Sequence, residues 1–275
     1  MNTRAASRRR ATDELVDRVA LDEFAAFHGD LTLNPVAIVM AAYKEADCIE
    51  TVVKGMPPVI HGLDTSVVVV VDGEDDGTGR IVRDAGHLAV IAPVNRGQGA
   101  ALRLGYRLAR ERGARYLVTA DADGQADPDD IAAALDPVVT GEADFVNGSR
   151  RLGETHGTDL MRNVGVVVYA TLVSVLCRTP VTDTANPIRA FPVALTARID
   201  LEEPQYQASE LLISAIMAGC RYEEVPVTMR TRVTGASKKG GNFAYGLRYG
   251  RVLLRTWWRE REKSRRLTAS ARSAV

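Results

Sequence analysis

Short apolar runs alternate with segments of helical spacing along most of the chain. Five of these runs predict buried strands, at residues 36–40, 66–71, 88–92, 116–120 and 144–147. Between the strands, apolar residues recur at helical spacing, as Ala101, Leu104 and Leu108 do. Strands that alternate with helices are typical of an α/β fold whose central sheet is mostly parallel and carries helices on both faces. We therefore predict one such domain over residues 35–241.

The two ends of the chain depart from this pattern. Residues 1–34 mix basic side chains with a weak helical spacing of apolar ones, which predicts a partly ordered basic leader. Residues 242–264 predict a basic amphipathic helix. Residues 265–275 are small and polar, which is typical of a disordered tail. The apolar members of the leader's spacing are Leu15, Val19, Phe24 and Phe27.

Composition and charge exclude several classes of protein. Lys+Arg and Asp+Glu balance at 35 each, so no net positive field favours nucleic acid as a partner. Three widely spaced cysteines and four scattered histidines form neither a zinc pattern nor a disulfide framework, which favours a reducing cytoplasm. The longest apolar run, residues 164–177, is shorter than the ~20 residues that span a bilayer.

One acidic stretch carries the candidate chemistry. Asp121, Asp123 and Gln125 follow the fourth predicted strand at single-residue spacing. Their carboxylate and amide oxygens are hard ligands of the kind that Mg²⁺ or Mn²⁺ prefers. The alternative is a solvated loop that caps the next helix, since Asp127 suits an N-cap position and Pro128 suits the first helical turn.

Polar residues also follow the neighbouring predicted strands. Glu45, Asp72 and Arg96 each come shortly after a strand, as Asp121 does. In sheets of this kind, ligands bind in the crevice outside the carboxyl ends of the strands. We therefore expect these four residues to gather at one edge of the sheet and to line a functional cleft.

Nine short motifs occur in order along the chain. Those of the first half are Ala-Tyr-Lys-Glu at 42–45, Val-Val-Asp-Gly at 70–73, Asn-Arg-Gly-Gln-Gly at 95–99, Asp-Ala-Asp-Gly-Gln at 121–125 and Gly-Ser-Arg at 148–150. Those of the second half lie at 183–191, 207–211, 224–227 and 235–238. Over roughly residues 36–240 the chain resembles the inverting family 2 glycosyltransferases, and it is most similar to their dolichol- or polyprenyl-phosphate mannose synthase branch.

This resemblance implies a GT-A nucleotide-sugar transferase fold with one divalent metal, Mg²⁺ or Mn²⁺. By matching motifs, it implies that the metal is held by Asp121, Asp123 and Gln125. The nucleotide-sugar donor, GDP-mannose or a UDP-sugar, would be bound by Ala42, Tyr43, Glu45, Asp72, Arg96, Gly97, Asp121 and Lys238. The acceptor phosphate would be bound by Arg150, Arg162 and Arg189.

Two positions depart from the family's pattern. Gly73 stands where the family often has a second Asp, which puts the contact with the base in doubt. Asn186-Pro187 replaces a usual Gly-Phe, which allows a differently shaped loop on the acceptor side.

The implied activity is transfer of a sugar from a nucleoside diphosphate to a polyprenyl phosphate. A metal with Lys or Arg stabilises the charge on the leaving diphosphate. A lipid phosphate is already ionised near neutral pH, so it needs guanidinium groups such as those of Arg150, Arg162 and Arg189 more than a base. A hydroxyl acceptor would need a general base, for which Glu210 is the candidate. The catalytic set is thus Asp123, Arg150, Arg189 and Glu210.

Each of these assignments has a structural alternative. Glu210 could simply be an acidic residue near a helix N-terminus, where the helix dipole favours negative charge. Arg162 and Arg189 could instead form surface ion pairs. A same-fold transferase that acts on a soluble hydroxyl acceptor, and a membrane-surface scaffold without catalysis, remain alternatives. A dinucleotide-dependent oxidoreductase is excluded, because no Gly-x-Gly-x-x-Gly follows the first strand.

The helix at residues 242–264 bears on where such an enzyme would work. It places Phe243, Leu247, Leu254 and Trp258 on one side and Arg248, Arg251, Arg255 and Arg259 along another. Basic and aromatic faces on one helix are typical of a segment in a membrane interface. The alternative is that Phe243 and Trp258 pack on the domain's own core. Because polyprenyl phosphates lie in membranes, we expect peripheral attachment to the cytoplasmic face, with residues 164–177 as a second contact or an ordinary buried helix.

Overall fold

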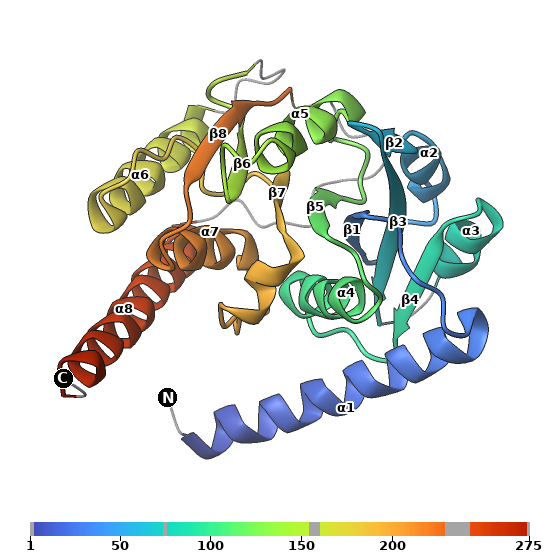
Figure 1. Cartoon of the computed structure of the whole chain (residues 1–275), viewed down its shortest axis with the longest axis horizontal. Coiled ribbons are helices and arrows are strands. Elements are labelled where there is room, and N and C mark those ends of the chain that lie inside the picture. Colours follow the sequence, from blue (N-terminus) through green and yellow to red (C-terminus); the bar gives the residue numbers. More distant parts are fainter. Residues whose placement is uncertain (1–2, 74–75, 154–159, 229–242, 274–275) are drawn as a thin grey trace.

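The computed structural model describes residues 3–73, 76–153, 160–228 and 243–273. At residues 3–9, 160–164, 243–245 and 267–273 it describes the backbone but not the side chains. Eight strands form one sheet in the order β2-β3-β1-β5-β7-β6-β8, and β4 pairs with β3 (Figure 1). Their bounds are β1 Val36–Ala42, β2 Val59–Ile60, β3 Leu63–Asp72, β4 Leu88–Ala92, β5 Tyr116–Asp121, β6 Phe145–Ser149, β7 Arg189–Pro192 and β8 Tyr222–Pro226.

The sheet is mixed but mostly parallel, as the sequence predicted. Strands β4, β3, β1 and β5 run parallel to one another, and β8 runs parallel to β6. Strand β7 lies antiparallel between β5 and β6. The helices are α1 Thr3–His28, α2 Ile49–Lys54, α3 Thr78–Asp84, α4 Gln98–Glu111, α5 Pro128–Val139, α6 Leu160–Cys177, α7 Gln207–Met217 and α8 Phe243–Ser273, with a 3₁₀ turn at Val193–Ala197.

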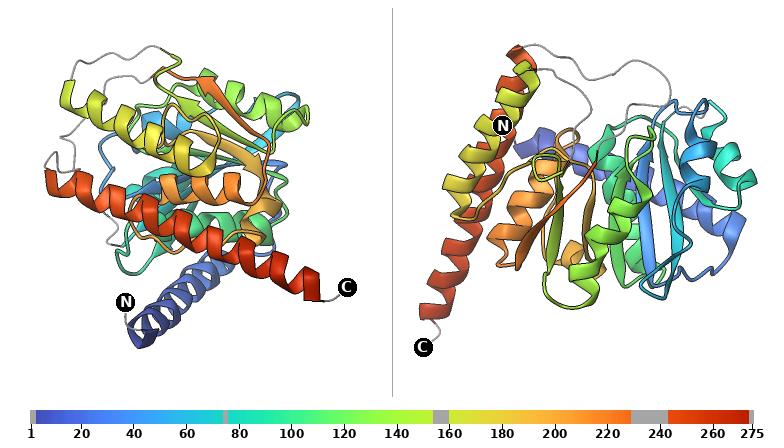
Figure 2. Two further views of the ribbon diagram at one scale, coloured as in Figure 1. Left: turned by 90° about the vertical axis from the view of Figure 1, so that its left-hand side faces the viewer. Right: turned by 90° about the horizontal axis from the view of Figure 1, so that it is seen from above.

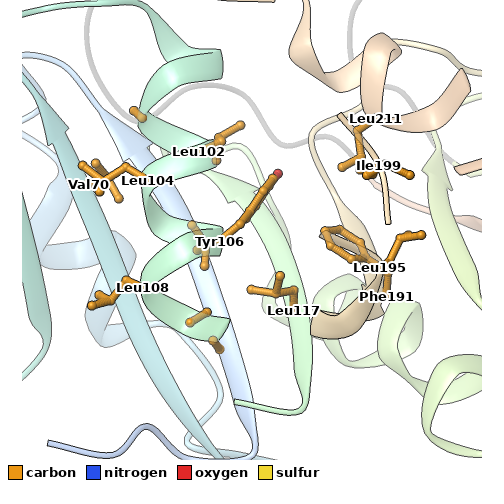
Figure 3. Packing of buried hydrophobic residues seen from close by; sticks show 14 of the residues in the cluster. Val70, Leu102, Leu104, Tyr106, Leu108, Leu117, Phe191, Leu195, Ile199 and Leu211 are labelled. Carbon is orange, nitrogen blue, oxygen red and sulfur yellow. The ribbon is translucent and has the colours of Figure 1, made fainter. Parts of the chain in front are cut away.

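The strands are apolar throughout because both faces of the sheet are covered. Alternate residues of β3 divide between two cores: Val68 and Val70 pack with α4 and α7, whereas Val67 and Val69 pack with α2, α3 and α5. Figure 3 shows the first core, in which Tyr106 of α4 points toward β5 and β7. This two-sided packing makes the sheet a rigid support for the loops at its edges.

Helix α1 replaces the partly ordered leader that the sequence suggested. It lies along β4 and α4 (Figure 1). Its buried residues are Val16, Ala20 and Phe24, so the expected apolar face is wrong except at Phe24. Leu15, Val19 and Phe27 are exposed instead. Val16, Ala20 and Phe24 recur four residues apart, so they lie on one face of the helix.

Helices α6 and α8 lie side by side (Figure 2), and α8 also packs on α7. The indole N–H of Trp257 in α8 donates to the carbonyl of Leu176 in α6 at 2.8 Å. Helix α8 continues to Ser273, so the segment expected to be a disordered tail is helical in the structure. None of the helices in the described ranges has the length and apolar character needed to cross a membrane.

Candidate active site

The register of the sheet brings the predicted polar residues to one edge. Strand β1 pairs Ala41 with Asp121 of β5, and it pairs Ala42 with the residue that precedes Asp72 in β3. Strand β7 is antiparallel, so its first residue, Arg189, arrives at this same edge and pairs two residues before Asp121. Two parts of this edge take their names from the substrates that the resemblance implies: we call the part built on β1, β3, β4 and β5 the donor half, and the part built on β6 and β7 the acceptor half.

On the donor half, Asp72 holds the loop that precedes α4. It is buried, and its carboxylate accepts the backbone N–H groups of Arg96 at 3.0 Å and of Gly97 at 2.7 Å. Burial raises the pKa of Asp72 above its ordinary value, because the hydrogen bonds from these two N–H groups offset only part of the lost hydration. The loop that opens α4 is therefore held by a carboxylate that was predicted to contact the nucleotide.

The side chain of Arg96 points elsewhere than the sequence suggested. Its guanidinium donates to the carbonyl of Asp13 at 3.0 Å and lies 2.8 Å from the carboxylate of Asp17, both in α1. Arg103 of α4 also lies 3.6 Å from the carboxylate of Asp13. The backbone N–H of Arg96 thus bonds to Asp72 in the site, while its guanidinium group holds α1. The local motif gives no sign that α1 packs here.

Two glycines in the donor half are required by close backbone approaches. Gly97 has φ 96°, and a Cβ there would lie 2.6 Å from the carbonyl oxygen of Pro204. Gly73 has φ 103°, and a Cβ there would lie 2.5 Å from the backbone nitrogen of Asn95. An Asp at position 73 would therefore clash with the loop, which explains this departure from the family's pattern.

The turn after β1 presents the other donor-side residues. Ala42 is buried at the strand end, Tyr43 is partly exposed, and Lys44 has a left-handed φ of 57° with its Nζ 5.5 Å from the centre of the Tyr43 ring. The backbone N–H of Glu45 donates to the Thr78 hydroxyl at 3.3 Å, which fixes this turn to the start of α3. The turn lies one strand away from the acidic motif.

The acidic motif at the end of β5 is ordered by its own hydrogen bonds. The Gln98 amide donates to Asp121 Oδ1 at 2.8 Å, which links the motif to α4. Asp123 is buried, and its Oδ1 accepts the backbone N–H of Gln125 at 3.1 Å. The helix-capping alternative applies to Asp127, whose side chain accepts the N–H of Asp129 at 3.1 Å, and not to Asp121 or Asp123.

These residues fit a magnesium or manganese ion that is shared with a diphosphate. The donor set consists only of carboxylate and amide oxygens, which suits a hard divalent ion. Within the described ranges, no group of three or more His, Cys, Asp or Glu side chains could hold a metal by itself. A Mg²⁺ or Mn²⁺ site typically uses one or two protein carboxylates and takes its remaining ligands from phosphates and water.

The acceptor half contains a buried bidentate ion pair. Arg150 follows β6, and its guanidinium meets the carboxylate of Asp183 at 2.6 Å (Nε to Oδ2) and 2.8 Å (Nη2 to Oδ1). Burial alone would raise the pKa of Asp183, but the hydrogen bonds and charge of Arg150 outweigh it and hold this pKa below its ordinary value. This aspartate was quoted in a motif but was not predicted as a site residue.

Arg189 is the largest fully buried side chain of the described residues, with 1% of its surface exposed, so the surface ion-pair alternative does not apply to it. Its Nε donates to Asn147 Oδ1 at 3.1 Å and its Nη2 donates to the carbonyl of Thr184 at 3.2 Å. Burial lowers its pKa, since the charged form loses hydration. The Arg162 side chain and all of Lys238 lie outside what the structure describes.

The loop at residues 182–184 is held by a glutamate of β8. Glu224 accepts the backbone N–H and the hydroxyl of Thr182 at 3.0 and 2.7 Å, and the backbone N–H of Asp183 at 3.3 Å. Tyr222 donates its hydroxyl to the same carboxylate at 2.7 Å. Glu224 lies in a quoted motif, but nothing in its spacing identified it as the anchor of this loop.

Glu210, the candidate general base, is surrounded by hydrogen-bond donors of the protein. It is fully buried, and its two oxygens accept the backbone N–H groups of Glu202 at 2.8 Å and of Glu203 at 2.9 Å. Arg259 of α8 also donates to Glu210 at 2.7 Å. Both oxygens of Glu210 are therefore engaged by donors from the protein itself. Arg259 therefore belongs to the inner side of α8.

The geometry can be compared with known proteins. Residues 37–194, more than half of the chain, match the family model described as glycosyl transferase family 2. The chain is 30% identical over 232 residues to a dolichyl-phosphate hexose transferase of Haloferax volcanii, covering 84% of this chain and 98% of that one. It is 28% identical over 220 residues to a polyprenol monophosphomannose synthase of Mycolicibacterium smegmatis, covering 74% and 81%.

Solved structures agree on the fold. A glucosyl-3-phosphoglycerate synthase from Mycobacterium tuberculosis, in complex with Mn²⁺, UDP and glucosyl-3-phosphoglycerate, superposes with a TM-score of 0.64 at 21% identity. The match covers 81% of this chain and 80% of that one. At this identity the likeness establishes a GT-A-like architecture and leaves the substrates to be argued from the site.

Proposed function

This chain belongs to glycosyl transferase family 2, and from that premise we propose that it moves a hexose from a nucleoside-diphosphate sugar to a polyprenyl phosphate at a membrane surface. The observation that carries the proposal is the division of one sheet edge. Asp121 and Asp123 place carboxylates on the donor half, where they would serve as oxygen ligands, while Arg150 and Arg189 bring two guanidinium groups to the acceptor half. Relatives named for transfer to dolichyl and polyprenyl acceptors support the same acceptor class.

On the donor half, the chain's residues would bind and orient the nucleotide sugar. A bound Mg²⁺ or Mn²⁺, held by Asp121, Asp123 and Gln125, would supply charge stabilisation for the leaving diphosphate. Gln98 orients the Asp121 carboxylate through its 2.8 Å hydrogen bond. Tyr43 and the loop at 95–97, which Asp72 holds in place, would contact the nucleoside.

On the acceptor half, the reaction needs cations more than a base. A phosphate monoester is ionised near neutral pH, so its oxygen attacks without first losing a proton to the protein. Arg150 would orient that phosphate while Asp183 keeps the guanidinium charged and fixed. The engaged position of Glu210 disfavours the alternative in which this residue activates a hydroxyl acceptor.

Attachment to a membrane surface is supported by exposed apolar side chains on two neighbouring helices. They are Val168 and Val175 of α6 and Leu247, Leu254 and Trp258 of α8, each about half exposed or more. Val175 and Trp258 are 70% and 56% exposed, so the alternative in which Trp258 packs on the core is wrong. Arg248 and Arg251 are exposed on the same helix, and basic residues beside apolar ones favour an anionic lipid surface.

The first test is a panel of nucleotide-sugar donors with Mg²⁺ or Mn²⁺, incubated with and without a polyprenyl phosphate and read by mass spectrometry. A lipid-phosphate sugar formed from one donor is the expected product. Asp123→Ala should reduce this turnover at least a hundredfold while the circular dichroism spectrum stays unchanged. Turnover that requires a soluble hydroxyl acceptor instead would overturn the proposed acceptor class.

A further inference from the structure

Helix α8 has an inner side that reaches the acceptor half of the site. Its buried residues Tyr249, Leu253, Thr256 and Glu260 recur at helical spacing and face the protein. Tyr249 is the polar member nearest the loop at 182–184. Its hydroxyl lies 2.7 Å from the Thr184 hydroxyl and accepts a hydrogen bond from Ser209 at 2.5 Å.

Thr184, which Tyr249 contacts, is linked to both arginines of the acceptor half. The Thr184 carbonyl accepts the Arg189 guanidinium at 3.2 Å, and the preceding residue, Asp183, carries the ion pair with Arg150. A displacement of Thr184 would therefore move a partner of each guanidinium. The Ser209 hydroxyl oxygen also lies 3.1 Å from this carbonyl, so Tyr249, Ser209 and Thr184 form one small polar cluster.

Contacts other than the Tyr249 hydroxyl also attach α8 to the body of the protein. Trp257 already bonds to α6, Arg259 bonds to Glu210, and Leu253 is completely buried. Tyr169 of α6 provides a comparable hydroxyl contact, donating to the carbonyl of Gly246 at 2.6 Å. What distinguishes Tyr249 is that its hydroxyl contacts a loop of the site instead of another helix.

We infer that Tyr249 is a positioning residue for the acceptor phosphate, acting through Thr184 on Arg150 and Arg189. The inference rests on the proposed function, because it assigns the acceptor half to a phosphate. Burial raises the pKa of Tyr249 to about 12, so its hydroxyl stays protonated and can donate to Thr184 at any physiological pH. Helix α8 then carries the exposed Leu254 and Trp258 on one side and a contact to the phosphate-binding loop on the other.

The experiment compares Tyr249→Phe with the matched control Tyr169→Phe. Each variant deletes one tyrosine hydroxyl at an α8 contact, and each keeps the ring that packs Tyr169 against Tyr249 at 4.9 Å. Binding of farnesyl phosphate is measured by calorimetry, and the KM values for donor and acceptor are measured on the active enzyme. Tyr249→Phe should weaken binding of farnesyl phosphate and raise the acceptor KM by about fivefold, the order expected for one lost neutral hydrogen bond, and should leave the donor KM unchanged.

A second pair of variants separates positioning from stability. Thr184→Ser keeps the hydroxyl and should retain wild-type acceptor KM, whereas Thr184→Val should reproduce the effect of Tyr249→Phe. The double variant Tyr249→Phe with Thr184→Val should be no worse than either single change, since both remove the same hydrogen bond. Tyr169→Phe should leave both KM values unchanged.

The outcomes distinguish this inference from the proposed function. If the wild-type protein binds no farnesyl phosphate, the proposed function fails and the inference fails with it. If the wild type binds but Tyr249→Phe binds equally well and only its melting temperature falls, as in Tyr169→Phe, then Tyr249 is structural and the inference alone is overturned.

Discussion

The two halves of the site hold their buried aspartates in different ways. On the donor half, Asp72 accepts two backbone N–H groups, and burial leaves its pKa raised. On the acceptor half, Asp183 meets the guanidinium of Arg150 in a bidentate pair, and its pKa is lowered. At Asp72 the two N–H groups and the charge of Arg96 offset only part of the effect of burial on the pKa, whereas at Asp183 the hydrogen bonds and charge of Arg150 more than offset it. The comparison therefore predicts that the fold depends more on the charge of Asp183 than on the charge of Asp72.

The halves also differ in the helix that braces them. The donor loop is docked to α1 by the contacts of Arg96 with Asp13 and Asp17. The acceptor half is braced by α8 through Tyr249 and Arg259. Each brace comes from one end of the chain, which is why the segments outside the matched family region still bear on the site.

The largest expected effect comes from breaking the acceptor-side ion pair. Asp183→Asn should lower the free energy of unfolding by about 3 kcal/mol, because it leaves a buried guanidinium without its carboxylate. Urea unfolding measures this change. The matched control is Asp144→Asn, which breaks a bidentate pair with Arg221 of similar geometry on the exposed surface. The control should change stability far less, and equal effects would refute the contrast.

A somewhat smaller effect is expected at Glu210. Glu210→Gln removes the buried charge that faces Arg259 and should lower the free energy of unfolding by about 2 kcal/mol. Turnover by the folded fraction should stay within about threefold of wild type, since a positioned general base typically contributes a hundredfold or more. Loss of turnover at unchanged stability would restore Glu210 as a base.

The dependence of stability on pH should have opposite signs at the two aspartates. The lowered pKa of Asp183 stabilises the fold above the unfolded value of about 3.9, and this contribution is lost as the pH falls through the folded value. The raised pKa of Asp72 has its favourable effect below about 3.9, and this effect is lost as the pH rises through the folded value. As the pH rises, the free energy of unfolding of wild type should therefore increase relative to that of Asp183→Asn. Over the same range it should decrease relative to that of Asp72→Asn.

This prediction is checked by urea unfolding of wild type and both variants between pH 3 and pH 7. Parallel curves for the two variants would mean that the buried aspartates do not differ in their coupling to protons. That result would remove the electrostatic contrast between the two halves.

The smallest effect is expected where α1 meets the donor loop. Asp17→Asn should lower stability by about 1 kcal/mol, less than Asp183→Asn does, because Arg96 keeps its hydrogen bond to the Asp13 carbonyl and the Asp17 side chain is 18% exposed. It should raise the donor KM slightly and leave the acceptor KM unchanged. Glu23→Gln, which loosens the exposed pair of Glu23 with Arg83 elsewhere on α1, is the control. A larger change in acceptor KM than in donor KM would show that the halves are not braced separately.

The sequence predicted the edge of the sheet correctly but not the direction of every side chain along it. The positions of Asp72 and Asp121 follow from strands that end in carboxylates, a pattern confined to a few neighbouring residues. Arg96 was misread because its guanidinium is directed by Asp13, which lies 83 residues away in the sequence. Gln98 belongs to a quoted motif, but its contact with Asp121 depends on how α4 lies beside β5.

Local pattern alone was sufficient for five of the eight strands, the mostly parallel sheet, the acidic motif and the family, because each depends on residues that are neighbours in the chain; β2, β7 and β8 were not predicted. The packing of distant segments was needed to establish that Glu210 is an anchor, that Asp183 holds Arg150, and that Tyr249 reaches Thr184. A buried side chain takes the direction in which its hydrogen bonds or charge are satisfied, and those partners arrive from α1, α8 and β8. Hydrophobic spacing identifies which residues can be buried, but it does not say which polar group will meet them there.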